Sequence, residues 1–184
     1  DLPALPQQAA QRQPVRQTVF RRTPQASSPA ARRRATRVIA DGDDDLRRQQ
    51  PTAARQHYHQ AILATPDRAL PRFRTAMAEI LLGRYDQAVA LLKQGLELDP
   101  DWPHTGESLD ELLGPDNGLL KTLLIEKVSG WVKQRLRSPD RLFLLGVLLH
   151  FDSDKKNSRL LFRTAWKLGD RGQHLAAFLD PVAR

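Results

Sequence analysis

Three acidic residues in alternating positions come nearer to a metal-site spacing than any other side chains of this sequence: Asp41, Asp43 and Asp45. Alternating carboxylates open the calcium-binding loop of helix-loop-helix sites. That loop also needs a glycine at its sixth position and a bidentate glutamate at its twelfth. Leu46 and Thr52 stand at those two positions. We therefore expect no calcium site here.

Five histidines are the next candidates for metal binding or acid-base chemistry. His57 and His59 are two residues apart, which on a helix turns them about 200° away from each other, so they cannot share one ion. His104, His150 and His174 are scattered along the chain. The sequence has no cysteine, no phosphate-binding glycine loop, no nucleophile elbow and no paired-carboxylate pattern. We expect no catalytic residues, no metal and no cofactor.

The positive charge of the chain is concentrated near its beginning. Residues 1–40 contain eight arginines and one acidic residue, whereas the remainder has 21 basic and 20 acidic side chains, within a net charge of +8. Prolines punctuate a mixture of Gln, Ala, Ser and Arg over residues 1–36, which cannot bury enough apolar surface to fold. We predict a disordered basic tail or linker over this segment. Its arginine clusters, with one arginine just beyond, are Arg21, Arg22, Arg32, Arg33, Arg34 and Arg37.

From residue 37 onwards the sequence shows helical periodicity. In the clearest stretch, Phe73, Met77 and Ile80 follow one another at three- and four-residue steps, which predicts an amphipathic helix. A Gly-Arg-Tyr-Asp turn at 83–86 separates it from a second periodic stretch that ends at Pro100. Two such helices cannot bury their apolar faces alone, so neighbouring pairs must cover them.

The same helix-turn-helix pattern recurs after a shift of 34 residues, with small residues on small ones and large on large. The matched positions are Gly42 and Ala76, Leu46 and Ile80, Ala54 and Ala88, Tyr58 and Leu92, Ala61 and Gly95, Ile62 and Leu96, and Pro66 and Pro100. Small residues at such positions let two helices approach closely, while bulky ones fill the gaps between them. The sequence therefore predicts a repeat architecture.

This period and layout resemble the tetratricopeptide repeat family, in particular its bacterial members. The resemblance is carried by the run GRYDQA-x3-L-x2-G-L-E-L-D-P over residues 83–100 and by the LDPDWP that ends at Pro103. It implies an all-α fold, a right-handed α-solenoid of about four helix-turn-helix repeats behind the disordered tail. The expected repeat domain spans 37–184, with repeats at 37–66, 67–102, 103–138 and 139–170 and a capping helix at 172–179.

The third of these repeats is expected to be degenerate. Ser108 and Glu111 have the spacing of a capping box for a short helix that ends near Gly114. A long amphipathic helix should follow, from about Asn117 to Arg137. The small-residue signature of the family is missing from residues 103–138, so the first helix of this repeat should be altered.

The resemblance also suggests where a partner would bind. In the family, the first helix of each repeat lines a concave face, and this implies a non-catalytic scaffold or adaptor that binds a peptide or protein there. The matching residues, which could equally be core between repeats, are Leu70, Phe73, Met77, Ile80, Phe143, Val147 and His150. The Lys and Asn clamp that some members use to hold the carboxyl terminus of heat-shock chaperones is absent here, so we expect no binding of such tails.

Two other function hypotheses remain open. In the first, the arginine-rich tail binds nucleic acid or another anionic surface and the repeats serve assembly. In the second, the repeats recruit a catalytic part from elsewhere. No apolar run approaches the roughly 18 residues of a membrane span. The chain begins with Asp1, so we expect a processed or excised fragment, cytoplasmic or, if an anchor precedes it, envelope-associated. The compartment and the oligomeric state stay open.

Overall fold

Apolar stripes at helical spacing fold into helices throughout the part of the chain that the computed structural model describes, residues 26–169 and 171–179. Within these ranges there are ten α-helices, one 3₁₀ turn and no strand. The elements are α1 (Pro29–Arg47), α2 (Pro51–Ala64), α3 (Leu70–Leu81), α4 (Tyr85–Leu98), α5 (Trp102–Thr105), α6 (Leu109–Leu113), η1 (Pro115–Asn117), α7 (Gly118–Lys133), α8 (Pro139–Phe151), α9 (Lys155–Lys167) and α10 (Gln173–Leu179). The predicted all-α solenoid is confirmed.

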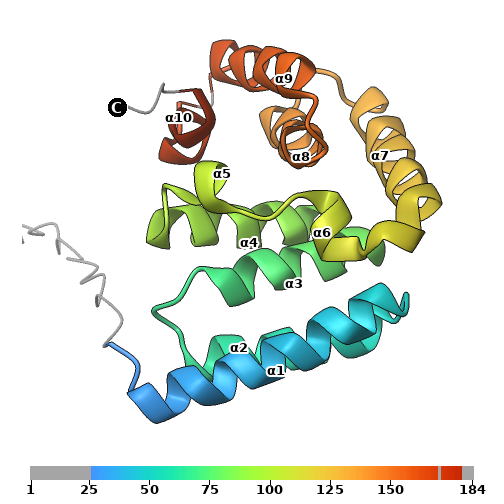
Figure 1. The fold of residues 1–184 in the computed structure, drawn as a ribbon. Coiled ribbons are helices and arrows are strands. Elements are labelled where there is room, and N and C mark those ends of the chain that lie inside the picture. Colours follow the sequence, from blue (N-terminus) through green and yellow to red (C-terminus); the bar gives the residue numbers. More distant parts are fainter. Residues whose placement is uncertain (1–25, 170, 180–184) are drawn as a thin grey trace, which may run out of the picture.

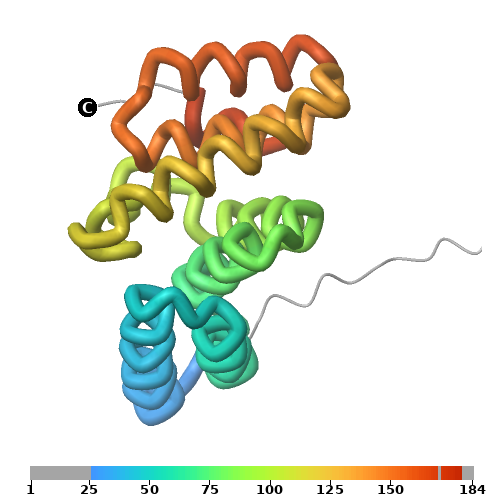
Figure 2. Tube along the Cα trace, turned by 90° about the vertical axis from the view of Figure 1, so that its right-hand side faces the viewer, coloured from blue at the N-terminus to red at the C-terminus, as the bar shows by residue number. Residues whose placement is uncertain are grey.

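Three regular helix pairs make the body of the solenoid. Figure 1 shows α1 with α2 at the bottom, α3 with α4 above them and α8 with α9 at the top. The pair α8–α9 packs onto α4 although forty residues separate them in sequence, and α10 packs against both α9 and α4. The view in Figure 2, turned by 90°, shows the same succession of layers. No helix of the described residues is both long and apolar enough to cross a bilayer.

In each regular pair, an aromatic ring of one helix packs directly on a glycine of the other helix, which lets the two helices approach closely. A Cβ atom placed on Gly42 would lie 2.6 Å from the ring of Tyr58, and one on Gly146 would lie 2.7 Å from the ring of Phe162. Gly95 stands in the same relation to Phe73, in reversed order along the chain. A glycine inside a helix lowers helix stability by about 1 kcal/mol relative to alanine. Here it allows the ring to pack directly on the neighbouring backbone, which accounts for a glycine in the interior of α1.

The first helix begins earlier than predicted. The Ser28 hydroxyl accepts from the backbone N–H of Ala31, and Pro29 occupies the first turn, where its missing N–H does no harm. The alanines and arginines that follow are good helix formers. Ala35 and Ile39 are buried. The prediction of disorder is therefore wrong for residues 29–36. It rested on the proline-rich composition and did not consider the cap that starts a helix at Ser28. Residues 1–25 lie outside the described part of the chain.

The segment after Pro100 departs from the regular pattern, as expected. In place of one long first helix it forms the short helices α5 and α6, and the predicted capping box between Ser108 and Glu111 is present. Gly114, with φ +91°, makes the turn into η1. Helix α7 ends at Lys133, four residues earlier than predicted, and stands beside α8 in Figure 1. Short helices leave this segment free to lie across the faces of its neighbours.

Candidate functional site

Two clefts meet on the side of the solenoid where α1 and α3 face outwards. The first, the α1–α3 cleft, has a volume of about 360 Å³ and lies between α1, the α2–α3 turn and the end of α4. Its lining residues are Arg32, Ala35, Thr36, Ile39, Thr65, Asp67, Arg68, Ala69, Leu70, Pro71, Leu98 and Asp99. The second, the α3–α5 cleft, has about 140 Å³ and is lined by Leu70, Phe73, Arg74, Asp99, Trp102, Thr105, Gly106 and Glu107. Because Leu70 and Asp99 belong to both, the two clefts form one groove.

The turn between α2 and α3 is a rigid wall of this groove. Arg72 donates to the carbonyls of Pro66 and Arg68 and so holds the turn against the first turn of α3. On the other side, both the backbone N–H and the hydroxyl of Ser27 donate to the carboxylate of Asp67. These hydrogen bonds hold the pKa of Asp67 below its ordinary value, so the carboxylate stays charged. The wall therefore joins the start of α1 to the start of α3.

The α1–α3 cleft combines an apolar interior with charges at its edge. Leu70 is 45% exposed and lies beside Ala35, Ile39 and Pro71 in the lining, so this leucine presents apolar surface within the cleft. The guanidinium of Arg32 and the carboxylate of Asp99 stand among its polar lining groups. Such a surface offers an apolar contact for a side chain and both signs of charge for a backbone or polar groups. It offers no arrangement of nucleophile and base.

Of the seven predicted groove residues, Leu70 alone lines the α1–α3 cleft. Phe73 borders the α3–α5 cleft but is 5% exposed. The four others that are almost fully buried are Met77, Ile80, Phe143 and Val147. His150 is half-buried, and its Nε2 donates to the carbonyl of Pro103 at 2.8 Å. In this structure the apolar five are part of the core, and a role for these six residues in partner binding stays a prediction. The segment from Trp102 to Leu112, which sequence periodicity could not place, lies against Phe73, Met77, Ile80 and Val147. Phe143 instead packs against Phe162 and Phe178.

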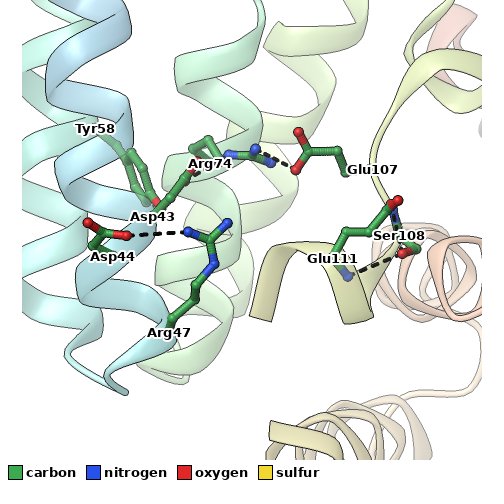
Figure 3. A network of polar contacts seen from close by, with 8 residues as sticks. All are labelled: Asp43, Asp44, Arg47, Tyr58, Arg74, Glu107, Ser108 and Glu111. Atoms are coloured by element: carbon green, nitrogen blue, oxygen red, sulfur yellow. Dashed lines mark hydrogen bonds and ion pairs between the residues drawn. The ribbon is translucent and has the colours of Figure 1, made fainter. Parts of the chain in front are cut away.

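A buried arginine at the centre of the groove was missed by the sequence reasoning. Arg74 lies between Asp43 of α1, whose Oδ1 is 3.0 Å from its Nε, and Glu107, whose Oε2 is 2.7 Å from its Nη2 (Figure 3). Tyr58 donates to the same Asp43 at 2.6 Å. Burial and this neighbouring carboxylate raise the pKa of Tyr58, which keeps its proton. The available signal was an arginine directly after Phe73, within the apolar stripe of α3.

Two of the three alternating acidic residues weighed for calcium, Asp43 and Asp45, make contacts within the fold. Asp43 pairs with Arg74 and Tyr58, and the carboxylate of Asp45 lies 3.2 Å from Nδ1 of His57. Asp44 pairs with Arg47 on the same helix. Among the described residues, no group of three or more His, Cys, Asp or Glu side chains converges as metal ligands would.

The arginines predicted to form a basic tail divide into three sets. Arg21 and Arg22 lie outside the described residues. Arg32 lines the α1–α3 cleft. Arg33, Arg34 and Arg37 are exposed on α1, and no carboxylate of the described part of the chain pairs with them.

Helix pairs with small residues at their crossings, stacked into one body with a groove along the first helices, define a helix-turn-helix repeat protein of the solenoid class. Residues 45–105 match the sequence model of the tetratricopeptide repeat, so this part of the chain consists of tetratricopeptide repeats. No curated protein matches the chain.

Several solved structures have a similar arrangement of helices. The second tetratricopeptide repeat domain of human RPAP3, solved in complex with an HSP70 peptide, is 15% identical with a TM-score of 0.42, over 81% of this chain and 94% of that one. The Sgt2 domain from Aspergillus fumigatus is 13% identical with a TM-score of 0.40, over 84% and 77%. MamA from Desulfovibrio magneticus RS-1 is 19% identical with a TM-score of 0.38, over 79% and 83%. At these scores the likenesses say nothing about the partner or mechanism of this chain.

Proposed function

We propose that this protein is a non-catalytic interaction module that binds a peptide or protein segment in the groove between α1, α3 and α5. The observation that carries the proposal is the exposed Leu70 at the junction of two clefts. A volume of about 360 Å³ lies within the range of roughly 300 to 1,000 Å³ of ligand pockets. The groove is therefore large enough for a short stretch of another chain.

The lining of the α1–α3 cleft indicates what such a segment offers. An apolar side chain would pack on Leu70 and Ile39, which removes apolar surface of both partners from water. Arg32 and Asp99 would then face polar or charged groups of the segment. Because both signs of charge border the cleft, selectivity should come from the position of these charges more than from net charge.

A peptide-display selection on the intact chain tests the proposal. Peptides enriched on the wild-type protein are measured against two variants, Leu70→Glu in the groove and Leu160→Glu on α9, where the leucine is 63% exposed. We expect Leu70→Glu to weaken binding at least tenfold, about 1.4 kcal/mol, and Leu160→Glu to bind as wild type. Equal losses in both variants, or none in either, would contradict the proposal.

A second candidate function rests on the free arginine face of α1. Arg33, Arg34 and Arg37 are exposed on α1, and no carboxylate of the described residues pairs with them, so this face can make charge contacts with an anionic partner. Nucleic acid bound there should dissociate steeply as salt rises, because each phosphate contact releases counterions. Replacement of all three arginines by glutamine should remove this binding while the peptide test above is unaffected. Salt-independent nucleic-acid binding, or its survival in the triple variant, would exclude this candidate.

A further inference from the structure

The chain's own segment from Asp99 to Ser108 covers the part of the groove face that α3 shares with α8. We propose that this segment is a built-in competitor, held in a socket for a peptide that carries a large aromatic residue and, five positions later, a carboxylate. In the resting protein Trp102 and Glu107 take those two places. This inference rests on the proposed function and names the chemistry of the partner.

The aromatic half of the socket is built by the body of the solenoid. The ring of Trp102 stacks on Phe73 of α3 at 3.8 Å, with 11° between the planes. It also meets Phe151 of α8 at 4.4 Å and the edge of Phe178 of α10 at 6.5 Å. These three phenylalanines belong to regular helices and are themselves buried, whereas Trp102 comes from the four-residue helix α5. The socket therefore does not depend on the segment that fills it.

The acidic half is organised in the same way. Arg74 stays fixed by Asp43, which Tyr58 in turn holds, whichever carboxylate approaches from the other side (Figure 3). The side chain of Glu107 is 51% exposed, whereas that of Arg74 is only 9% exposed. A carboxylate from a partner could replace Glu107 without moving the arginine. Charge-assisted pairs to a fixed guanidinium are among the stronger hydrogen bonds available to a peptide.

The segment itself is lightly held between its two ends. His104, Thr105 and Glu107 are exposed. Outside the Trp102 ring, and among the residues that the structure describes, two side-chain hydrogen bonds tie it to the body, from His150 to the carbonyl of Pro103 and from Arg74 to Glu107. A space of about 30 Å³ remains beneath it, in contrast to the close packing of a protein interior. The buried leucines of α6 would anchor the chain when the preceding residues open.

A partner peptide would bind more favourably than the segment because it makes additional contacts in the α1–α3 cleft. Its aromatic side chain and carboxylate would make contacts equivalent to those they replace, so the exchange at the socket is close to neutral. The rest of the peptide would fill the α1–α3 cleft, which shares Leu70 and Asp99 with the socket region and is lined by no residue of the segment after Asp99. Binding is then favoured by the additional burial, since only a difference in affinity between the closed and open states shifts the equilibrium.

Gly106→Ala opens the segment without removing any residue of the socket. A Cβ atom there would lie 2.7 Å from Nε1 of Trp102 and 2.8 Å from the ring of Phe151, whereas one on Gly118 meets nothing within 4 Å. The probe is a fluorescent peptide with the sequence of residues 99–108, titrated by anisotropy into the intact chain. We expect Gly106→Ala to bind it at least tenfold more tightly than wild type or Gly118→Ala. Peptides with the tryptophan changed to alanine, or the glutamate to glutamine, should bind at least tenfold more weakly.

A folded Gly106→Ala variant that binds the probe no better than Gly118→Ala would overturn the inference. If Gly106→Ala does not fold, hydrogen exchange on the wild-type protein decides. The amides of His104 and Gly106 donate within α5, and they should exchange at least tenfold faster than hydrogen-bonded amides in the middle of α3. Equal protection would mean that the segment is permanent core. Thr36 lines the α1–α3 cleft but not the α3–α5 cleft. Thr36→Glu therefore reports on the α1–α3 cleft and this probe on the Trp102 socket, so the failure of either proposal can be told from the failure of the other.

Discussion

Gly146 and Gly130 provide a matched pair that tests how the helix pairs are held together. Both lie inside helices, Gly146 in α8 and Gly130 in α7. A Cβ atom on Gly146 would lie 2.7 Å from the ring of Phe162, whereas one on Gly130 meets nothing within 4 Å. The same substitution by alanine therefore adds the same methyl group to a closed contact and to an open one.

The expected magnitudes follow from two opposing effects. Alanine stabilises a helix interior by about 1 kcal/mol relative to glycine, and both variants gain this. At Gly146 the methyl group must displace a fully buried ring that is stacked on Phe178 at 4.4 Å, and overpacking of this kind costs about 1 to 3 kcal/mol. The difference between the two variants isolates the steric cost. For a chain of this size, a steric cost of about 1 to 3 kcal/mol corresponds to a difference of roughly 2 to 12 °C between the Tm values of the two variants.

Thermal unfolding followed by circular dichroism measures both variants against wild type. We expect Gly130→Ala at or above the Tm of wild type and Gly146→Ala clearly below Gly130→Ala. Phe162→Leu should relieve the clash, so Gly146→Ala should cost less in that background. If Gly146→Ala proves as stable as Gly130→Ala, the close contact between α8 and α9 does not exist and the packing argument fails.

Three further predictions concern burial and titration. Ala88→Leu should lower the free energy of unfolding by about 1 to 3 kcal/mol, because Ala88 is fully buried at the crossing of α4; an unchanged denaturation midpoint would contradict this. Met77→Glu should destabilise the fold far more than Leu70→Glu, since Met77 is buried and Leu70 is exposed; equal Tm values would place Met77 at the surface. Burial holds the pKa of His150 below its usual 6.5. As the pH drops below about 6.5, His150 of the unfolded chain therefore binds a proton before His150 of the folded chain does, and the free energy of unfolding falls. His150→Gln should flatten the fall in Tm between about pH 7 and 5.5, and an unchanged slope would show that His150 does not cause it.

Local periodicity was sufficient to predict most of the fold. The apolar stripes of α3 and α8, the Ser108 capping box and the small residues at helix crossings are encoded within one or two turns of chain. The start of α1 was not predicted, because the Ser28-Pro29 pair that begins the helix lies in a proline-rich segment. At this point the composition predicts disorder whereas the Ser28 cap predicts a helix, and the structure follows the cap.

The candidate site was harder to predict because its contacts are distant in sequence. Trp102 packs on Phe151 and Phe178, and nothing in the pattern around Trp102 indicates those partners. Residues such as Met77 were therefore assigned to an open face that the segment after Pro100 covers. Arg74 was missed for the same reason, since both of its carboxylate partners lie on other elements.

The direct test of the central claim, that a partner occupies the groove between α1 and α3, is site-specific photocrosslinking in the natural host. A benzophenone side chain is introduced in place of Thr36, which lines the α1–α3 cleft, or in place of Leu160, which is exposed on α9. We predict a discrete crosslinked product from the Thr36 position, none from the Leu160 position, and its loss when Leu70→Glu is added. A product from the Leu160 position alone, or one from Thr36 that persists with Leu70→Glu, would contradict the account.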